Sequence, residues 1–112
     1  DLWWNPLENG WGINLTQHPN GQVFAVWYTY AADTGPLWLV MSGGQWTTSR
    51  TFTGDFYRTS GPSYDKLPFN PNAVGRTMVG TITFNFMDES NGSFTWVVDG
   101  VQGTKTITRQ GF

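Results

Sequence analysis

Apolar and polar residues alternate along most of this chain with a period of two. The pattern is clear at 12–17, where Ile13 and Leu15 share one face, and it recurs in the second half of the chain. Such alternation is typical of β-strands with one buried and one exposed face. It predicts strands at 12–17, 22–31, 37–46, 50–57, 76–86, 93–98 and 101–109. In the strand at 76–86, one face is expected to hold Met78, Ile82, Phe84 and Phe86.

Short turn sequences separate the predicted strands. They include His18-Pro19-Asn20-Gly21, Asp33-Thr34-Gly35-Pro36, Asn91-Gly92 and Asp99-Gly100, which suit tight hairpins because Asn, Asp and Gly tolerate positive φ angles. Gly43-Gly44 interrupts the third strand and predicts a bulge or bend. Consecutive hairpins favour an all-β fold: an antiparallel up-and-down meander of seven or eight strands that closes into a small barrel and so removes its edge strands. A β-sandwich is the alternative.

We expect a single β domain at 1–112 with one long loop at 58–73. That loop contains Gly61, Pro62, Pro68 and Pro71, which argue against a strand or helix. Loops of this length inside compact domains are often functional or mobile.

Composition and charge exclude several classes of protein. Charged residues make up 12% of the chain, aromatic residues 17%, and there is no cysteine. These values exclude a disordered chain, a disulfide scaffold and a cysteine-based zinc site. The net charge is −2 and the six basic residues are scattered, which argues against nucleic acid as a partner. No apolar run reaches the roughly 20 residues of a membrane helix. The start at Asp1, without a signal peptide, indicates a mature product or an excised domain.

Residues with catalytic or metal-binding chemistry are few. The only histidine, His18, falls in a predicted turn, where a solvated role is the usual one. Most carboxylates also fall in turns, and Asp55 is expected to be a polar outward residue of a strand. Asp88-Glu89-Ser90-Asn91 lacks the regular ligand spacing of a calcium loop. We therefore expect no enzyme activity, no metal and no cofactor.

Aromatic residues carry the strongest functional signal. Six of the seven tryptophans lie in the first 46 residues. The strands at 22–31 and 37–46 are apolar on both faces, so one face needs a cover: the Trp3-Trp4 segment, the loop at 58–73, a partner or a ligand. Core packing accounts for many tryptophans, but exposed rings beside neutral amides also suit sugar rings. The candidate ligand-binding residues are Trp11, Asn14, Tyr30, Trp38, Gln45 and Trp46.

Several motifs together resemble a known type of domain. They are Trp3-Trp4-Asn5-Pro6, Gly10-Trp11-Gly12-Ile13-Asn14, Trp27-Tyr28-Thr29-Tyr30, Pro36-Leu37-Trp38-Leu39-Val40, the stretch from Gly54 to Pro62, the stretch from Val79 to Phe84, and Ile107-Thr108-Arg109-Gln110. The series is similar to a Trp-rich domain of secreted proteins of Gram-negative bacteria, found in tandem or appended to enzymes. The resemblance implies an exported module, at the cell surface, outside the cell or in the periplasm, and implies no reaction.

A weaker likeness is to lipocalin and avidin barrels. These begin with a strand that bears a tryptophan, and lipocalins end with an arginine that packs across it. Trp3 or Trp4 and Arg109 hold comparable places here, and we expect a cation–π contact to close the barrel.

Three functional hypotheses follow. The first is a non-catalytic extracellular binding module that binds carbohydrate through surface aromatics. The second is a structural or assembly subunit of a secreted or cell-surface complex, with the doubly apolar strands and the loop at 58–73 as contacts to a protein partner or to another copy. The third is a barrel for a small hydrophobic ligand, which needs a hollow interior, whereas so many aromatics are expected to fill one.

Overall fold

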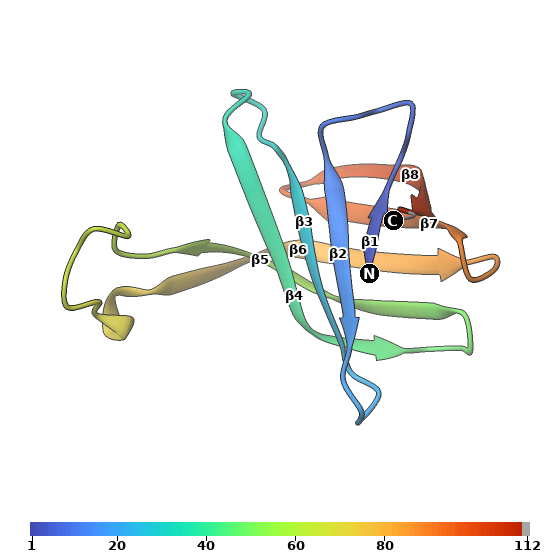
Figure 1. Cartoon of the computed structure of the whole chain (residues 1–112), viewed down its shortest axis with the longest axis horizontal. Coiled ribbons are helices and arrows are strands. Elements are labelled where there is room, and N and C mark those ends of the chain that lie inside the picture. The colour runs from blue at the N-terminus through green and yellow to red at the C-terminus, as the bar shows by residue number, and fades with distance from the viewer. Residues whose placement is uncertain (111–112) are drawn as a thin grey trace.

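Eight antiparallel strands close into one barrel in the computed structural model, which describes residues 1–110 (Figure 1). The strands are β1 (Leu2–Trp4), β2 (Gly12–Gln17), β3 (Val23–Tyr30), β4 (Pro36–Trp46), β5 (Thr51–Ser60), β6 (Gly75–Phe86), β7 (Asn91–Val98) and β8 (Val101–Arg109). Each strand pairs with the next along the chain, and β1 pairs with β8. The predicted meander and barrel are confirmed, and the sandwich alternative is wrong. Within 1–110, no helix is long and apolar enough to cross a membrane.

The predicted loop at 58–73 is wrong at its start. Arg58, Thr59 and Ser60 continue β5, because they pair with the first residues of β6: Gly75, Arg76 and Thr77. The remaining connection, 61–74, contains a short 3-10 helix, η1 (Pro71–Ala73), which the Asn70 side chain caps by accepting the backbone N–H of Asn72. The backbone ladder between β5 and β6 therefore extends further than the turn residues suggested.

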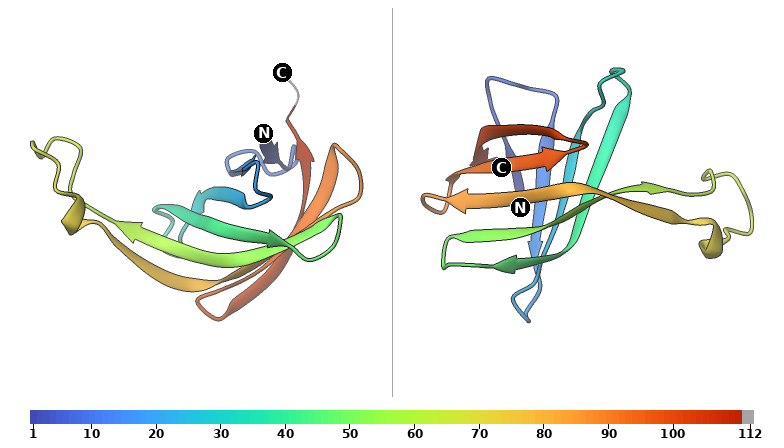
Figure 2. Two further views of the ribbon diagram at one scale, coloured as in Figure 1. Left: turned by 90° about the horizontal axis from the view of Figure 1, so that it is seen from below. Right: turned by 180° about the vertical axis from the view of Figure 1, so that it is seen from behind.

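This extension makes an arm that projects from the barrel (Figures 1 and 2). We call residues 59–76 the arm and residues 61–74 its tip. The arm lies to the left in Figure 1, away from the seam where β1 pairs with β8. Strands β5 and β6 thus belong to the barrel at one end and to the arm at the other.

Two bulges alter which residues face the interior. The first lies in β4, where Val23 pairs with Gly44 but Ala25 pairs with Met41, as predicted from Gly43-Gly44. The second lies in β6, where Phe56 pairs with Gly80 and Tyr57 pairs with Met78, so that Val79 is the extra residue. The prediction that Met78 shares a face with Ile82 and Phe84 is therefore wrong: Met78 is exposed, while Ile82 and Phe84 are buried.

Aromatic and aliphatic side chains fill the barrel interior. The fully buried side chains are Ile13, Leu39, Met41, Phe52, Phe56, Ile82, Phe84, Phe94 and Ile107. Trp27 lies among them, with its ring centroid 5.1 Å from that of Phe94 and 5.2 Å from that of Trp96. Gly103 leaves room for Trp96, since a Cβ at this position would overlap the indole ring. These side chains form the core of the barrel, and Trp96 packs against it.

The barrel closes where β1 meets β8. Trp3 pairs with Arg109 and is buried, whereas Trp4, on the other face of the strand, pairs with Thr108 and is half-buried. The Arg109 guanidinium lies over the ring of Trp3, and not of Trp4, which was the other candidate for this cation–π contact.

The connections between strands define two ends of the barrel. The loop end holds the connections 5–11, 31–35 and 99–100 and the base of the arm. The terminal end holds the connections 18–22, 47–50 and 87–90, together with Asp1 and Gln110.

Candidate ligand-binding site

A hollow of about 610 Å³ opens at the loop end of the barrel. Its apolar lining comes from the core side of the strands and includes Leu37, Leu39, Val98 and the rings of Trp27 and Trp96. Its polar lining comprises Thr29, Asp33, Arg58, Asp99 and Lys105. Small-molecule sites have this volume and this mixture of an apolar lining with a few polar groups.

A second hollow, of about 640 Å³, adjoins the first. Both are lined by Ala31, Asp33, Leu37 and Arg58. The second also includes Gly35, Pro36, Trp38 and Thr59, so it lies around the turn from β3 to β4 and extends toward the outer face of the barrel. The two hollows therefore share a wall that carries one carboxylate and one guanidinium.

Trp38 is the most exposed tryptophan of the described chain and borders the second hollow. Its side chain points outward from β4 and is 62% exposed. Tyr28, its partner across β3 and β4, packs against it with a ring-centroid distance of 5.2 Å and an interplanar angle of 87°. Tyr30, at the end of β3, is 59% exposed and lines the first hollow. Two predicted ligand residues thus lie at the loop end.

Arg58 faces the first hollow because of its register. It pairs with Leu39, whose side chain is buried in the core, and cross-strand partners share a face. Its guanidinium lies 3.0 Å from the Asp99 carboxylate, and both side chains are about half exposed. Exposed ion pairs contribute only about 0–1 kcal/mol to stability. A ligand can therefore replace one partner of the pair at little cost in free energy.

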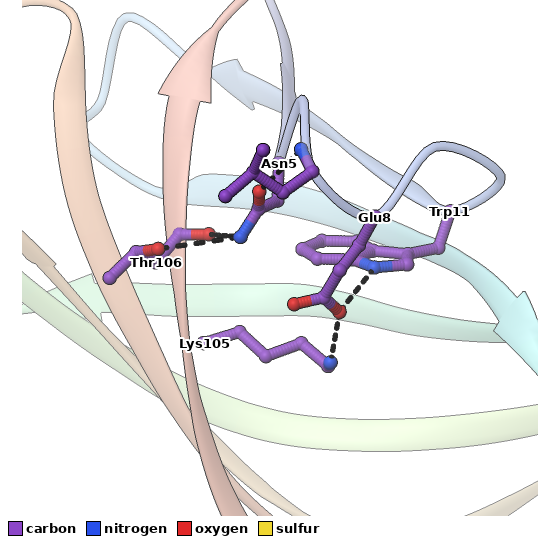
Figure 3. Close-up of polar contacts among 6 residues, drawn as sticks. Asn5, Glu8, Trp11, Lys105 and Thr106 are labelled. Carbon is purple, nitrogen blue, oxygen red and sulfur yellow. Dashed lines mark hydrogen bonds and ion pairs between the residues drawn. The ribbon is translucent and has the colours of Figure 1, made fainter.

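Trp11 is held by polar contacts at the same end (Figure 3). Its indole N–H donates to the Glu8 carboxylate at 3.1 Å, and Lys105 donates to the same oxygen. The Lys105 ammonium lies 5.3 Å from the Trp11 ring centroid. Hydrogen bonds from Lys105 and then from Trp11 lower the pKa of Glu8. Trp11 is half-buried and packs edge-on against Phe94. It lines neither hollow itself but contacts Lys105, which lines the first one.

Asn5 ties the loop that carries Glu8 and Trp11 to β8 (Figure 3). Its side-chain amide donates to the backbone oxygen and the hydroxyl of Thr106, each at 3.4 Å, while its Oδ1 accepts the backbone N–H of Leu7 at 2.9 Å. The loop at 5–11 is thus anchored to β8 at two points, by Asn5 at Thr106 and by the ion pair of Glu8 with Lys105.

Trp27 lines the first hollow, and its indole N–H is buried without an acceptor within residues 1–110. An unsatisfied buried donor costs about 1–3 kcal/mol, and native structures contain few of them. A ligand oxygen that reached this N–H would recover that free energy.

The six predicted ligand residues do not form one surface. Trp11, Tyr30 and Trp38 lie around the loop end, and Asn14 lies on the barrel wall between Leu2 and Val26. Gln45 and Trp46 lie at the terminal end, where Trp46 pairs with Phe52 and packs on its ring. The site residues that the sequence did not indicate are Asp33, Arg58, Asp99 and Lys105.

The doubly apolar strands β3 and β4 present one face to the core. Val23, Ala25 and Trp27 point inward, while Val26 and Val40 pair with each other on the outer face. Trp3 lies inside the barrel, and the arm extends away from this outer face (Figure 1). The arm therefore does not cover this face, whereas Trp4, the other residue of the Trp3-Trp4 segment, is half-buried on the outer face of β1.

The Asp88 side chain stabilises the turn in which it lies. It accepts the backbone N–H of Ser90 at 2.7 Å and the side-chain amide of Asn91 at 3.1 and 3.2 Å, and these bonds lower its pKa. In the described residues, no group of three or more His, Cys, Asp or Glu side chains is placed to hold a metal ion.

Comparisons with protein-family models, with curated proteins and with solved structures found no match to this chain. The functional argument therefore rests on the geometry of the site.

Proposed function

We propose that this domain is a non-catalytic carbohydrate-binding module that is exported from the cell and binds its ligand at the loop end of the barrel. The observation that carries the proposal is the position of Trp38. Its exposed ring stands at the edge of a hollow whose wall also holds Asp33, Arg58 and Thr59. An aromatic ring suits the C–H face of a pyranose, and carboxylate, guanidinium and hydroxyl groups suit its hydroxyls.

The Trp38 ring is positioned before a ligand arrives. Tyr28 packs nearly perpendicular to it, which restricts its rotation. Ordering a mobile side chain on binding costs about 0.5–1.5 kcal/mol. The restricted ring avoids part of this cost, which leaves more of the interaction free energy for binding of a polar ligand.

The two adjoining hollows favour an oligosaccharide over a single sugar. Asp33 and Arg58 line both hollows, while Trp38 borders one and Tyr30 the other. A chain of two or more sugar units crossing the shared wall meets an aromatic ring on each side of these charged groups. Trp27 lines the first hollow, and its buried indole N–H has no acceptor within residues 1–110, so a sugar oxygen that reached this N–H would satisfy it.

Export is supported by the resemblance to the Trp-rich domain of secreted bacterial proteins.

Affinity electrophoresis through gels that contain a panel of polysaccharides tests this function. We expect one glycan to retard the domain and Trp38→Ala to abolish the retardation. Trp46→Ala, at the opposite end, is the matched control and should migrate with the wild type; circular dichroism of both variants checks that they fold. The proposal is wrong if no glycan retards the wild type, and the site is misplaced if Trp46→Ala, and not Trp38→Ala, loses the retardation.

A further inference from the structure

We propose that copies of this domain associate head to tail, with the tip of the arm of one copy inserted into the hollow at the terminal end of the next. This association is independent of the carbohydrate site, because the tip and the terminal end lie away from both hollows described above.

Large apolar side chains are exposed at the tip of the arm. Tyr64 is 94% exposed and Leu67 is 86% exposed, and Phe69 and Val74 are also exposed. Among the described residues, no hydrogen bond or ion pair joins the tip to the barrel; its bonds are local, such as that from the backbone N–H of Lys66 to Ser63 O at 3.1 Å. Clustered apolar side chains held away from their own core mark a contact surface.

The tip is already structured. The Asn70 cap and the backbone bonds from Ala73 to Asn70 and from Val74 to Pro71 hold η1, and the Ser63 hydroxyl donates to Asp65. Below the tip, the pairing of Ser60 with Gly75 continues the ladder of the arm. A tip with this local order loses little conformational entropy when it docks.

The terminal end provides a complementary hollow, which we call the socket. It has a volume of about 500 Å³ and an apolar floor of Leu15, Val23 and four aromatic rings. These rings are Trp3, Trp46, Phe52 and Phe86, and the ring centroids of Trp3 and Phe86 lie 5.1 Å apart. Trp46 remains 37% exposed. The socket has room for an apolar side chain or two from the tip.

The charges of the tip and of the socket rim are complementary. The tip carries Asp65 next to Lys66. Five charged residues line the socket: Asp1, Arg50, Asp88, Glu89 and Arg109. Arg109 pairs with Asp1, and Asp88 accepts hydrogen bonds from Ser90 and Asn91, which leaves Arg50 and Glu89 to meet the tip. Arg50 donates one N–H to Met87 O at 2.8 Å and keeps other donors, while Glu89 has no hydrogen bond or ion pair within residues 1–110. The geometry points to Lys66 with Glu89 and Asp65 with Arg50 as the intermolecular pairs.

The arrangement of β5 and β6 decides the symmetry. Phe52 and Phe86 place one end of these strands at the socket, and the other end of the same strands bears the tip. A contact between different surfaces of two copies is heterologous, so it repeats into a ring or an open chain. Aromatic side chains bury about 150–250 Å² each. One docked tip therefore buries roughly 1,000 Å² in total, which is at the small end of specific interfaces. A contact of this size is weak, so the association depends on concentration.

Sedimentation velocity without any glycan tests the proposal with two variants. The tip variant combines Tyr64→Ser, Leu67→Ser and Phe69→Ser; the socket variant combines Arg50→Glu and Glu89→Lys, both on exposed residues. We expect the wild type to grow beyond a dimer as its concentration rises toward millimolar, and each variant to stay monomeric. An equimolar mixture of the two variants is expected to form a dimer and nothing larger, because only one intact tip and one intact socket remain.

Other results overturn the proposal. A wild type that is monomeric at every concentration, or that stops at a dimer, contradicts head-to-tail contact. So do variants that still associate and a mixture that does not dimerise. Trp38→Ala serves as the control on the outer face: if it abolishes association while the socket variant does not, the interface lies on β3 and β4 instead. Circular dichroism of the two variants shows whether their barrels are intact, so a failure of glycan binding in the wild type leaves the sedimentation result unaffected.

Discussion

Arg109 lies across Trp3 at the seam where β1 and β8 close the barrel, with its guanidinium carbon 5.6 Å from the centroid of the indole ring. The same guanidinium lies 3.4 Å from the Asp1 carboxylate, and Trp3 packs inward on Phe86. One residue from the last strand thus covers a core residue of the first, so the contact links the two ends of the chain.

Arg109→Ala is expected to lower the stability of the domain. A partly exposed cation–π contact contributes about 0.5–1 kcal/mol, and a loss of 1 kcal/mol lowers Tm by about 4–8 °C in a domain near this size. Thermal unfolding followed by circular dichroism measures the change. Arg76→Ala is the matched control, because Arg76 lies 5.3 Å from the Tyr57 ring at the base of the arm and not at the seam. An unchanged Tm for Arg109→Ala contradicts its role in closure.

Phe94→Ala is expected to destabilise the fold far more. Phe94 is fully buried, and its ring contacts those of Trp11, Trp27, Phe84 and Trp96. Removal of a core phenylalanine side chain costs about 3–5 kcal/mol. Urea unfolding gives the change in the free energy of unfolding. Phe69→Ala, which removes the same side chain from the exposed tip, should change it by less than about 0.5 kcal/mol; similar losses for both variants are inconsistent with this core.

Arg58→Lys separates binding from stability. Lysine keeps the charge beside Asp99 but lacks the planar fork of donors that suits sugar hydroxyls and carboxylates. Because the exposed ion pair contributes little, Tm should change by no more than a few degrees. Affinity for the retarding glycan should fall by about tenfold, as for the loss of one hydrogen bond to a charged group. Equal affinity for both proteins, measured by titration calorimetry, removes Arg58 from the site.

Glu8→Gln is expected to change the pH dependence of stability. Hydrogen bonds from Lys105 and Trp11 lower the pKa of Glu8 below its ordinary value of 4.5. Because the folded state has the lower pKa, the contribution of ionised Glu8 is fully present above pH 4.5 and is lost as the pH falls through the lowered pKa. The difference in Tm between the wild type and Glu8→Gln should therefore be constant above pH 4.5 and shrink below it.

Glu89→Gln is the control for this comparison, since Glu89 makes no hydrogen bond or ion pair within residues 1–110. Its Tm difference from the wild type should stay small throughout acidification. A Glu8→Gln difference that widens toward acid pH has the wrong sign and refutes the assignment.

The strands, their order and the hairpins could be predicted from the sequence because they depend on neighbouring residues. Alternation places Ile13 and Leu15 on one face whatever surrounds them, and Asn-Gly or Asp-Gly pairs turn the chain locally. The predicted ranges at 12–17 and 101–109 coincide with β2 and β8 for this reason.

The positions of the functional side chains depend on register, which only the tertiary structure decides. Trp38 and Trp46 are eight residues apart, an even spacing that places both on one face of a regular strand. The bulge between them shifts the register by one residue. Trp38 therefore faces outward at the loop end, whereas Trp46 packs on Phe52 at the terminal end.

The position of Arg58 likewise could not be predicted from its local sequence. Its local sequence, followed by Gly61 and Pro62, indicates a loop, but pairing with β6 keeps it in β5 and turns it toward the hollow. The sequence by itself determined which segments are strands, because local backbone preference and alternation suffice for that. The tertiary structure decided which side chains meet, because a shift of one residue in pairing moves a side chain to the other face of the sheet.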